Sequence, residues 1–335
     1  MASATITDVA RLAGVSMKTV SRVMNAEAHV REAVRERVLS AARELHYRPR
    51  VSARSLAGAR SYAIGYLLVR SINPYAGQTQ LGALRACREA GYHLVVEITG
   101  EPEGGFDLET LLASASMDGM LLIPPLCDDT DVLDALDRAG MPYVRIAPAT
   151  DPGRSPYVDV EDQAAAAQMT AHLVALGHRR IGFVMGPEGH AASRRRLDGF
   201  RETLRTHGLP ADDALVRPGD FAFDSGAQAA AELLTLSEPP TAIFASNDVM
   251  ALGVMAKARE LGLRLPEDLS IAGFDDIPAA DMVWPGLTTV AQPIVQMATE
   301  ATRTLIALTR RAPTEPARRL SCELVIRGST APPGG

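Results

Sequence analysis

Cysteine is scarce and long hydrophobic runs are absent, and each absence argues against a class of protein. The three cysteines, Cys87, Cys127 and Cys322, are far apart and form no CxxC or Cys/His cluster. This spacing argues against a disulfide framework and a zinc site, and it is typical of reduced cytoplasmic proteins. No apolar run reaches the roughly 20 residues that span a bilayer, and the N-terminus has no signal-peptide pattern. We therefore expect a cytoplasmic protein without a metal site or a membrane segment.

The motifs of common enzyme classes are missing as well. No GxGxxG motif follows the first expected strand, and neither GxxxxGKS/T, HExxH nor GxSxG occurs in the chain. The carboxylates that follow the expected strands lack a candidate pair of nucleophile and base. We therefore expect a protein that is not an enzyme and needs no cofactor.

The charge is unevenly divided along the chain. Overall, 34 Lys and Arg against 40 Asp and Glu give a net charge of −6. Residues 1–60 hold 11 basic and 5 acidic residues and so carry +6, which leaves −12 on the rest of the chain. A basic head on an acidic body predicts a polyanion partner for the head alone.

From residue 61 onward, short apolar runs alternate with Ala-rich segments of helical pattern. At 335 residues the chain is long enough for two or three domains. Strands separated by helix-length intervals form βαβ units, and two such sets in tandem predict an α/β body of two doubly wound parallel-sheet lobes. Ligands bind at the carboxyl ends of such strands, so the cleft between the lobes is the expected pocket. The strands are expected at 64–69, 93–98, 119–123, 143–147, 180–186, 241–247 and 269–276, with later strand-like runs at 287–293 and 322–327 around a helix at 293–310.

The first 46 residues have the pattern of three short helices with a tight turn between the first two. Thr7 and Asp8 can cap the first helix, Gly14 supplies the positive φ of the turn, and Ser16 caps a second helix over about 17–25. This arrangement predicts an all-α helix-turn-helix, although any Ala-rich helical hairpin would share the pattern.

One face of the second helix carries groups that suit the major groove. Lys18 and Arg22 can donate to guanine O6 and N7, and Met17 can contact a thymine methyl group. Ser16 and Thr19 can hold phosphates at the helix N-terminus, where they position the protein without specifying a sequence.

The stretch TITDVARLAGVSMKTVSRVMN (5–25), followed by HVREAVRERVLSAARELHYRPR (29–50) and SARSLAG (52–58), resembles the lactose-repressor/galactose-repressor (LacI/GalR) family of bacterial transcription regulators. The resemblance covers the whole chain, since the body looks like that family's periplasmic-binding-protein-like domain. It implies a helix-turn-helix DNA-binding domain at 1–48, a hinge helix or linker at 49–60, and an effector-binding and dimerisation domain at 61–335. The first lobe would hold about 61–160 and 293–320, and the second about 161–292 and 321–335.

The resemblance also implies which residues contact DNA. The segment Ser52–Ala57 matches the hinge helix, which folds when two copies meet over the centre of a palindromic operator. There Ala53 lies in the minor groove, and Leu56 wedges into the central base step. In the head, the matching DNA-contacting positions are Thr5, Ser16, Met17, Lys18, Thr19, Ser21, Arg22, Asn25 and His29.

Polar residues that follow the strands of the body form the second candidate site. Arg can donate to two vicinal hydroxyl groups and Asp accepts from them, while Asn and Gln do both, so such a set suits a polyhydroxylated ligand. Two aromatic rings, Tyr75 and Phe221, would stack on a sugar face or a base, or simply belong to the core. By resemblance, the effector-binding candidates are Tyr75, Arg196, Phe221, Asn247, Asp275 and Gln292.

The chain departs from the family pattern at positions that bear on its ligands. The position after YVRI, often an acid in relatives, is Ala147, and the frequent Asp-Asn pair near the lobe crossover is Glu161-Asp162. The pair Met17-Lys18, at positions that set operator specificity, is particular to this chain. Neither the effector nor the operator can therefore be copied from a known member.

We expect a homodimeric, sequence-specific DNA-binding regulator, a repressor of carbohydrate-utilisation genes that responds to a small sugar in the cleft. A purine- or nucleoside-responsive regulator is the alternative within the family. A solute-binding protein would share the fold of the body, but it would have a signal peptide and no basic head.

Overall fold

The structure is a computed structural model that describes residues 4–24, 30–47, 60–69, 73–99, 108–114 and 116–334. The chain divides into two compact units, Met1–Tyr62 and Ala63–Gly335. Among the described residues, no helix has the length and apolar character needed to cross a membrane.

The first unit holds three helices around a small apolar core. They are α1 (Ile6–Ala13), α2 (Met17–Met24) and α3 (Glu32–Glu44). Gly14 has φ +65° and closes the turn between α1 and α2, which confirms the expected helix-turn-helix. The first cap was predicted wrongly, because Thr5 and not Thr7 precedes α1: Thr5 and Asp8 form a reciprocal capping box. The core consists of Val9, Ala10, Ala13, Val20, Val23, Val38, Ala41 and Ala42.

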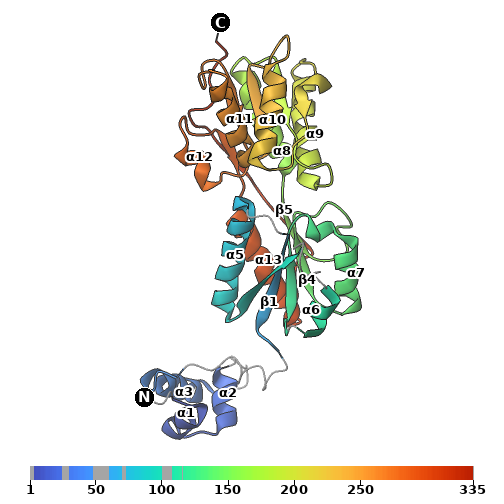
Figure 1. The fold of residues 1–335 in the computed structure, drawn as a ribbon. Coiled ribbons are helices and arrows are strands. Elements are labelled where there is room, and N and C mark those ends of the chain that lie inside the picture. The colour runs from blue at the N-terminus through green and yellow to red at the C-terminus, as the bar shows by residue number, and fades with distance from the viewer. Residues whose placement is uncertain are drawn as a thin grey trace. The chain divides into compact units, whose positions relative to one another are not determined.

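The first lobe of the second unit is built on a six-stranded parallel sheet of order β11-β5-β4-β3-β1-β2. Helices α5 and α13 pack together on one face, and α6 and α7 lie over the other (Figure 1). The strands are β1 (Ala63–Val69), β2 (His93–Thr99), β3 (Gly119–Leu122), β4 (Tyr143–Ile146), β5 (Tyr157–Val160) and β11 (Ala317–Leu320). The helices are α5 (Pro74–Ala90), α6 (Leu108–Ser114), α7 (Thr130–Arg138) and α13 (Ile294–Thr309).

The second lobe is built on a four-stranded parallel sheet of order β7-β6-β8-β9. Helices α8 and α9 pack on one face, and α10 and α11 on the other. The last two cross closely because Gly226 and Gly253 face backbone atoms of the partner helix, where a Cβ would clash at 2.1 Å. The elements are β6 (Ile181–Val184), β7 (Val216–Arg217), β8 (Ala242–Ala245), β9 (Ser270–Ala272), α8 (Asp162–Ala175), α9 (Ala191–Thr206), α10 (Phe223–Leu234), α11 (Asp248–Glu260) and α12 (Pro278–Met282).

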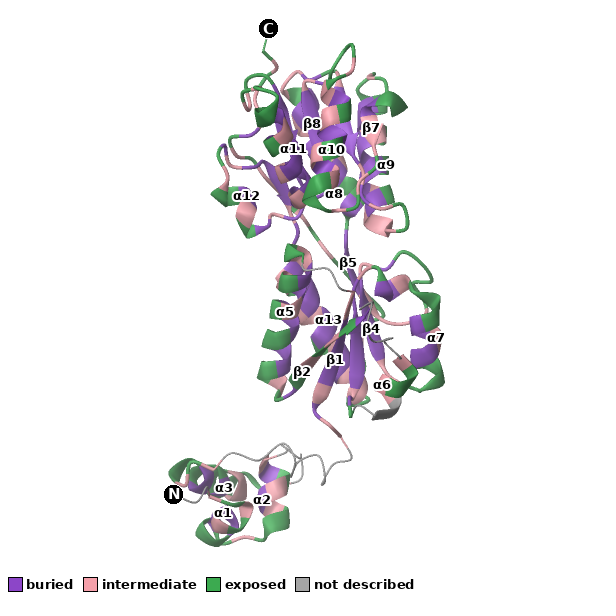
Figure 2. Cartoon of the chain, in the orientation of Figure 1, coloured by how far each residue is buried: buried purple, intermediate pink, exposed green. Residues whose placement is uncertain are grey.

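Three crossings join the two lobes. The chain passes from β5 to α8, returns from β10 (Thr289–Ala291) to α13, and passes again from β11 to β12 (Glu323–Val325), which pairs antiparallel with β10. Figure 2 shows that the strands and the inner faces of the helices hold the buried residues of both lobes. The expected α/β body of two doubly wound lobes is confirmed, whereas the sequence analysis did not list β5, β7 and β11.

Candidate functional site

The head presents exposed basic side chains on α2. Lys18 and Arg22 are exposed and Met17 is 54% exposed, while Val20 and Val23 are buried beneath them. An amphipathic helix of eight residues that turns a polar face outward is the form that a recognition helix needs to enter the major groove.

The N-terminus of α2 is held by local hydrogen bonds. Ser16 Oγ accepts from the backbone N–H of Thr19 at 3.1 Å, so Ser16 caps the helix as predicted. The two hydroxyl groups also lie 2.9 Å apart. Thr7 Oγ1 donates to Met17 Sδ at 3.4 Å, which ties α1 to the start of α2. Of the other predicted contacts, Thr5 caps α1 and Ser21 lies partly exposed on α2, whereas Asn25, His29, Ala53 and Leu56 lie outside the described residues.

A cavity that is partly open to solvent lies between the two lobes at the carboxyl ends of their strands. The structure brings all six predicted ligand residues to its wall, and their role as ligand contacts stays a prediction. The first lobe contributes Asn73, Pro74, Tyr75, Pro124 and Ala147, and the second contributes Asp162, His190, Ala192, Arg196, Phe221, Asn247, Val249, Asp275, Ile277 and Gln292.

Arg196 is the central cation of the cavity. The side chain is 5% exposed, its Nε and Nη2 lie 2.8 Å from Asp162 Oδ1, and its guanidinium stacks on the Phe274 ring at 3.7 Å. Nη1 donates to the Ser246 carbonyl at 2.5 Å and lies 3.7 Å from Asp275 Oδ1. Arg196 is therefore held rigidly by protein groups, and part of its donor capacity is left for a ligand.

Asp275 is both buried and strained. Its φ is +119°, a conformation that costs a non-glycine residue about 1–3 kcal/mol. Gln292 Nε2 donates to Asp275 Oδ1 at 2.6 Å. Burial raises the pKa of Asp275 to about 6, although the Arg196 charge and the Gln292 hydrogen bond act in the opposite direction.

Asn247 and Phe221 form another part of the wall. Asn247 caps α11 by accepting from the Met250 N–H at 2.9 Å, and its Nδ2 donates to the Phe221 carbonyl at 3.1 Å. Phe221 has φ +67°, and its ring lies edge-on to the His190 ring with centroids 5.4 Å apart. Asn247 thus holds the backbone at Phe221, and the His190 ring packs against its side chain.

Two neighbouring residues were not among the predicted ligand contacts. Asp162 was noted only as a departure from the family pattern, and His190 precedes α9 without any motif around it. Asp162 sits at the lobe crossover, and this position was the one signal that could have found it. Burial lowers the pKa of His190 and raises that of Tyr75, so both rings are uncharged near neutral pH.

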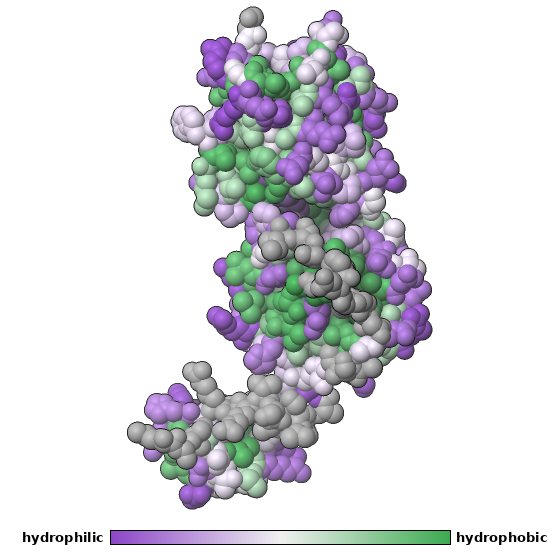
Figure 3. All heavy atoms as spheres, in the orientation of Figure 1, coloured by the Kyte–Doolittle hydropathy of each residue, from purple (hydrophilic) through white to green (hydrophobic). Residues whose placement is uncertain are grey.

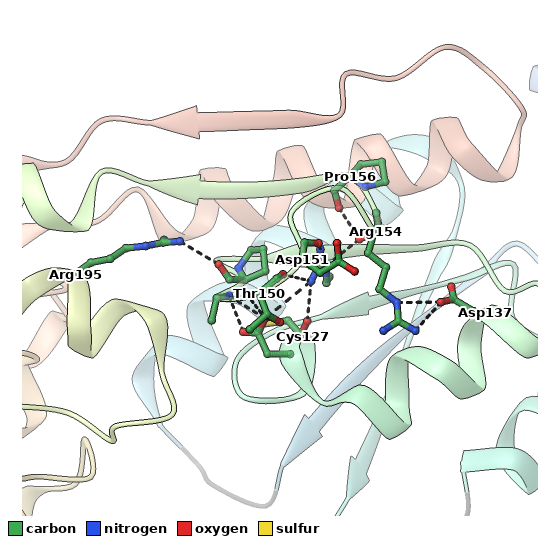
Figure 4. A network of polar contacts seen from close by, with 12 residues as sticks. Cys127, Asp137, Thr150, Asp151, Arg154, Pro156 and Arg195 are labelled. Atoms are coloured by element: carbon green, nitrogen blue, oxygen red, sulfur yellow. Dashed lines mark hydrogen bonds and ion pairs between the residues drawn. The ribbon is translucent and has the colours of Figure 1, made fainter.

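The loop after β4, residues 147–156, is fastened to the first lobe by a fully buried arginine. Arg145 donates from Nε to Ser155 Oγ at 3.0 Å and from Nη1 to the Thr150 carbonyl at 2.9 Å. The Asp128 carboxylate accepts from the Thr150 N–H at 2.9 Å, as part of the network in Figure 4. These hydrogen bonds therefore hold the loop against the first lobe.

The same loop contacts the second lobe directly. Ala147 lines the cavity with φ +50°, and the carbonyl of the next residue, Pro148, accepts from Arg195 Nη2 at 3.2 Å. Figure 4 shows Arg195 reaching across from α9 to this loop. Because Arg196 is its neighbour on α9, the cation in the cavity and the contact between lobes share one helical turn.

Comparisons with known proteins identify the family of both parts of the chain. Residues 5–50 match the family model of bacterial regulatory proteins, lacI family, and residues 170–330 match that of the periplasmic binding protein-like domain. The HTH-type transcriptional regulator CelR of Thermobifida fusca is 37% identical, over 97% of this chain and 98% of its own.

Solved structures extend this likeness to the fold. A complex of the transcriptional regulator CelR with cellobiose has a TM-score of 0.76 and 34% identity, and covers 97% of this chain and 99% of its own. The lac repressor dimer bound to operator and an anti-inducer has a TM-score of 0.76 and 30% identity, over 98% of this chain and 100% of its own. This chain belongs to the lacI family of bacterial regulatory proteins, which are DNA-binding regulators of transcription.

Proposed function

We propose that this protein is a homodimeric repressor of carbohydrate-utilisation genes whose operator affinity is set by a small saccharide in the interlobe cleft. The observation that carries the proposal is the convergence of Arg196, Asp275, Gln292 and Asn247 on one cavity, in a chain that also carries a recognition helix. Such a regulator acts in the bacterial cytoplasm, where the operator DNA is.

In this proposal the three parts of the chain have separate roles, with the boundaries that the sequence predicts. Residues 1–48 bind DNA through Lys18 and Arg22, residues 49–60 form the hinge, and residues 61–335 bind the effector and the second copy. An effector that changes the relative position of the lobes changes the hinge, so effector and operator binding are reciprocally coupled, typically by about 1–3 kcal/mol.

A saccharide suits the cavity better than a flat base. Arg196 retains donors, Asp275 and Asp162 offer acceptors, and Gln292 and Asn247 supply amides, which together match several hydroxyl groups around one ring. The complex of the related CelR holds cellobiose. A purine stacked on Phe221 or Tyr75 is the second candidate, because both rings line the cavity.

A second copy is needed because a two-fold operator requires two recognition helices. Met282 and Trp284 support such a contact, since Met282, the last residue of α12, is 81% exposed and Trp284 is 86% exposed. Figure 3 shows apolar side chains on this part of the second lobe. Singly exposed apolar residues are common, but a Trp and a Met two residues apart are typical of an interface.

We also propose that the cleft has no catalytic activity. Asp162 accepts from Arg196 and Asp275 accepts from Gln292, each through Oδ1, and no nucleophile with an adjacent base is among the described residues of its wall. The cavity binds the effector, and the head binds DNA.

The experiment has two arms. Selection of random DNA duplexes at low salt with the full chain and with residues 61–335 tests the head, and equal retention by both would refute the regulator. Thermal-shift screening against monosaccharides, disaccharides and purines then identifies the effector. Arg196→Ala and Asp275→Ala should abolish the effector response while operator binding persists, and a response that survives in both would refute the cleft assignment.

A further inference from the structure

The carboxylate of Asp162 is buried but only half satisfied. Its side chain is 1% exposed, and Oδ1 accepts from Arg196 Nε at 2.8 Å. Oδ2 is shielded from solvent and accepts no hydrogen bond from any residue that the structure describes. The nearby Arg195 Nη1 is 3.9 Å from Oδ2, which is beyond hydrogen-bonding distance. A buried carboxylate oxygen without a donor is unfavourable and marks a place where a donor from outside the chain would fit.

Arg195 lies near this oxygen but outside the cavity, whose described wall holds more carboxylates than cations. Among the described residues of the cavity wall, Arg196 is the single guanidinium, and it faces two carboxylates, Asp162 and Asp275. His190 and Tyr75 add no charge near neutral pH, because burial holds both rings in their neutral forms. The described wall therefore carries one more negative than positive charge whenever both carboxyl groups are ionised.

Arg196 does not offer an anion an open salt bridge. Its Nε and Nη2 are already at 2.8 Å from Asp162, Nη1 is on the Ser246 carbonyl, and one face lies on the Phe274 ring. A phosphate that approached its remaining donors would come close to the carboxylates of Asp162 and Asp275. In a site of low dielectric constant, that repulsion is only weakly screened.

We infer that Asp162 is a specificity-determining residue of the cleft, and that the effector presents to Asp162 Oδ2 a donor without negative charge, a hydroxyl or an ammonium group of a saccharide. Phosphorylated and carboxylated saccharides are excluded. This inference rests on the proposed effector site and names the chemical class that the site takes.

The test compares ligands that differ only in charge. Isothermal calorimetry on the full chain uses glucose with glucosamine and glucose 6-phosphate, ribose with ribose 5-phosphate, cellobiose, and adenosine with its monophosphate. We expect the neutral or amine-bearing member of a set to bind at least about tenfold more tightly than its phosphate. The reason is that two buried carboxylates and one cation of the cavity wall face the ligand. A phosphate that binds as tightly as its neutral counterpart would overturn the inference, and this arm needs no variant.

Asp162→Asn localises the effect to one atom. The amide keeps the size of the side chain and an oxygen for Arg196, but replaces Oδ2 by an N–H donor and removes one negative charge. The ratio of neutral to phosphorylated affinities should fall by about tenfold or more in this variant. Glu161→Gln is the matched control, because this exposed neighbour loses the same charge outside the cavity wall. An unchanged ratio in Asp162→Asn would assign the discrimination elsewhere and refute the role of Asp162.

Failure of the proposed function has a different signature. If adenosine binds and no saccharide does, the proposed saccharide effector is wrong. The comparison of adenosine with its monophosphate then still tests whether the cleft rejects a negatively charged ligand. If no compound of the panel binds, the cleft assignment and this inference both fail.

Discussion

Asp275→Asn should stabilise the protein at neutral pH while abolishing the effector response. Burial raises the pKa of Asp275 from 3.8 to about 6 in the folded protein. Between these two values the folded chain holds a proton that the unfolded chain has lost, so the free energy of unfolding falls as the pH rises. The difference of about two pKa units corresponds to about 3 kcal/mol above pH 6, of which about 2 kcal/mol accrues between about pH 4.5 and pH 7.5.

The Asn variant avoids this penalty because it has no charge to desolvate. Gln292 can still donate to Oδ1 of the amide, and the lost approach to Arg196 is a 3.7 Å contact rather than a hydrogen bond. We subtract about 1 kcal/mol for that contact and expect a net gain of about 1–2 kcal/mol at neutral pH. The gain should shrink to zero or reverse near pH 4.5, where most of the penalty of the native residue has gone.

Urea denaturation of the native protein and of Asp275→Asn, at about pH 4.5 and about pH 7.5, measures the difference in the free energy of unfolding. The control is Asp281→Asn, which removes a carboxylate whose side chain is 82% exposed. The difference in the free energy of unfolding between this variant and the native protein should be similar at both pH values. A variant that is less stable than the native protein at pH 7.5, or a gap equal at both pH values, would refute the reasoning. A gain in stability with loss of response is the expected pattern of a residue retained for binding.

Three further substitutions test other parts of the molecule. Arg22→Ala should cost about 1–3 kcal/mol of discrimination between the selected operator and its point variants, and retained sequence preference in gel retardation would exclude Arg22 as a base reader. Arg145→Met should lower the free energy of unfolding by about 3 kcal/mol or more, because carbonyl groups of the 147–156 loop lose their buried donor, and unchanged urea denaturation would contradict this. Trp284→Ser should weaken the dimer by more than about tenfold in sedimentation analysis, and an unchanged dimer would place the interface elsewhere.

The sequence predicted those elements for which the hydrophobic pattern and the position in the chain indicate the same structure. The turn at Gly14 and the apolar positions of α1 and α2 are set by local geometry, so the helix-turn-helix was accessible without tertiary information. The main strands were found within a few residues because they are short, apolar and fully buried. The ligand residues that follow strands were found because the carboxyl ends of parallel strands share one edge of the sheet.

Other elements depend on contacts that no local pattern contains. The edge strand β11 has the sequence ARRL and is mostly exposed, so it has neither alternation nor hydrophobicity, and only its pairing with β5 makes it a strand. Arg145 lies inside the buried strand YVRI, where an arginine would be placed at the surface by its type alone. Most of its partners are backbone carbonyl groups, those of Cys127, Thr150 and Asp151, and backbone acceptors leave no mark in a sequence.

The pair Asn247-Asp248 shows where residue type stops predicting role. Both follow β8, both are buried and both can cap α11. Asn247 lines the ligand cavity, whereas Asp248 faces away from it, accepting from the Ile277 N–H at 2.9 Å and from Thr289 Oγ1 at 2.5 Å. Burial raises the pKa of Asp248 well above its usual value, so a perturbed carboxyl in this lobe does not by itself mark the ligand site. What separates the two residues is the direction of consecutive side chains at a helix N-terminus, and that direction is known only once α11 has been packed on the sheet.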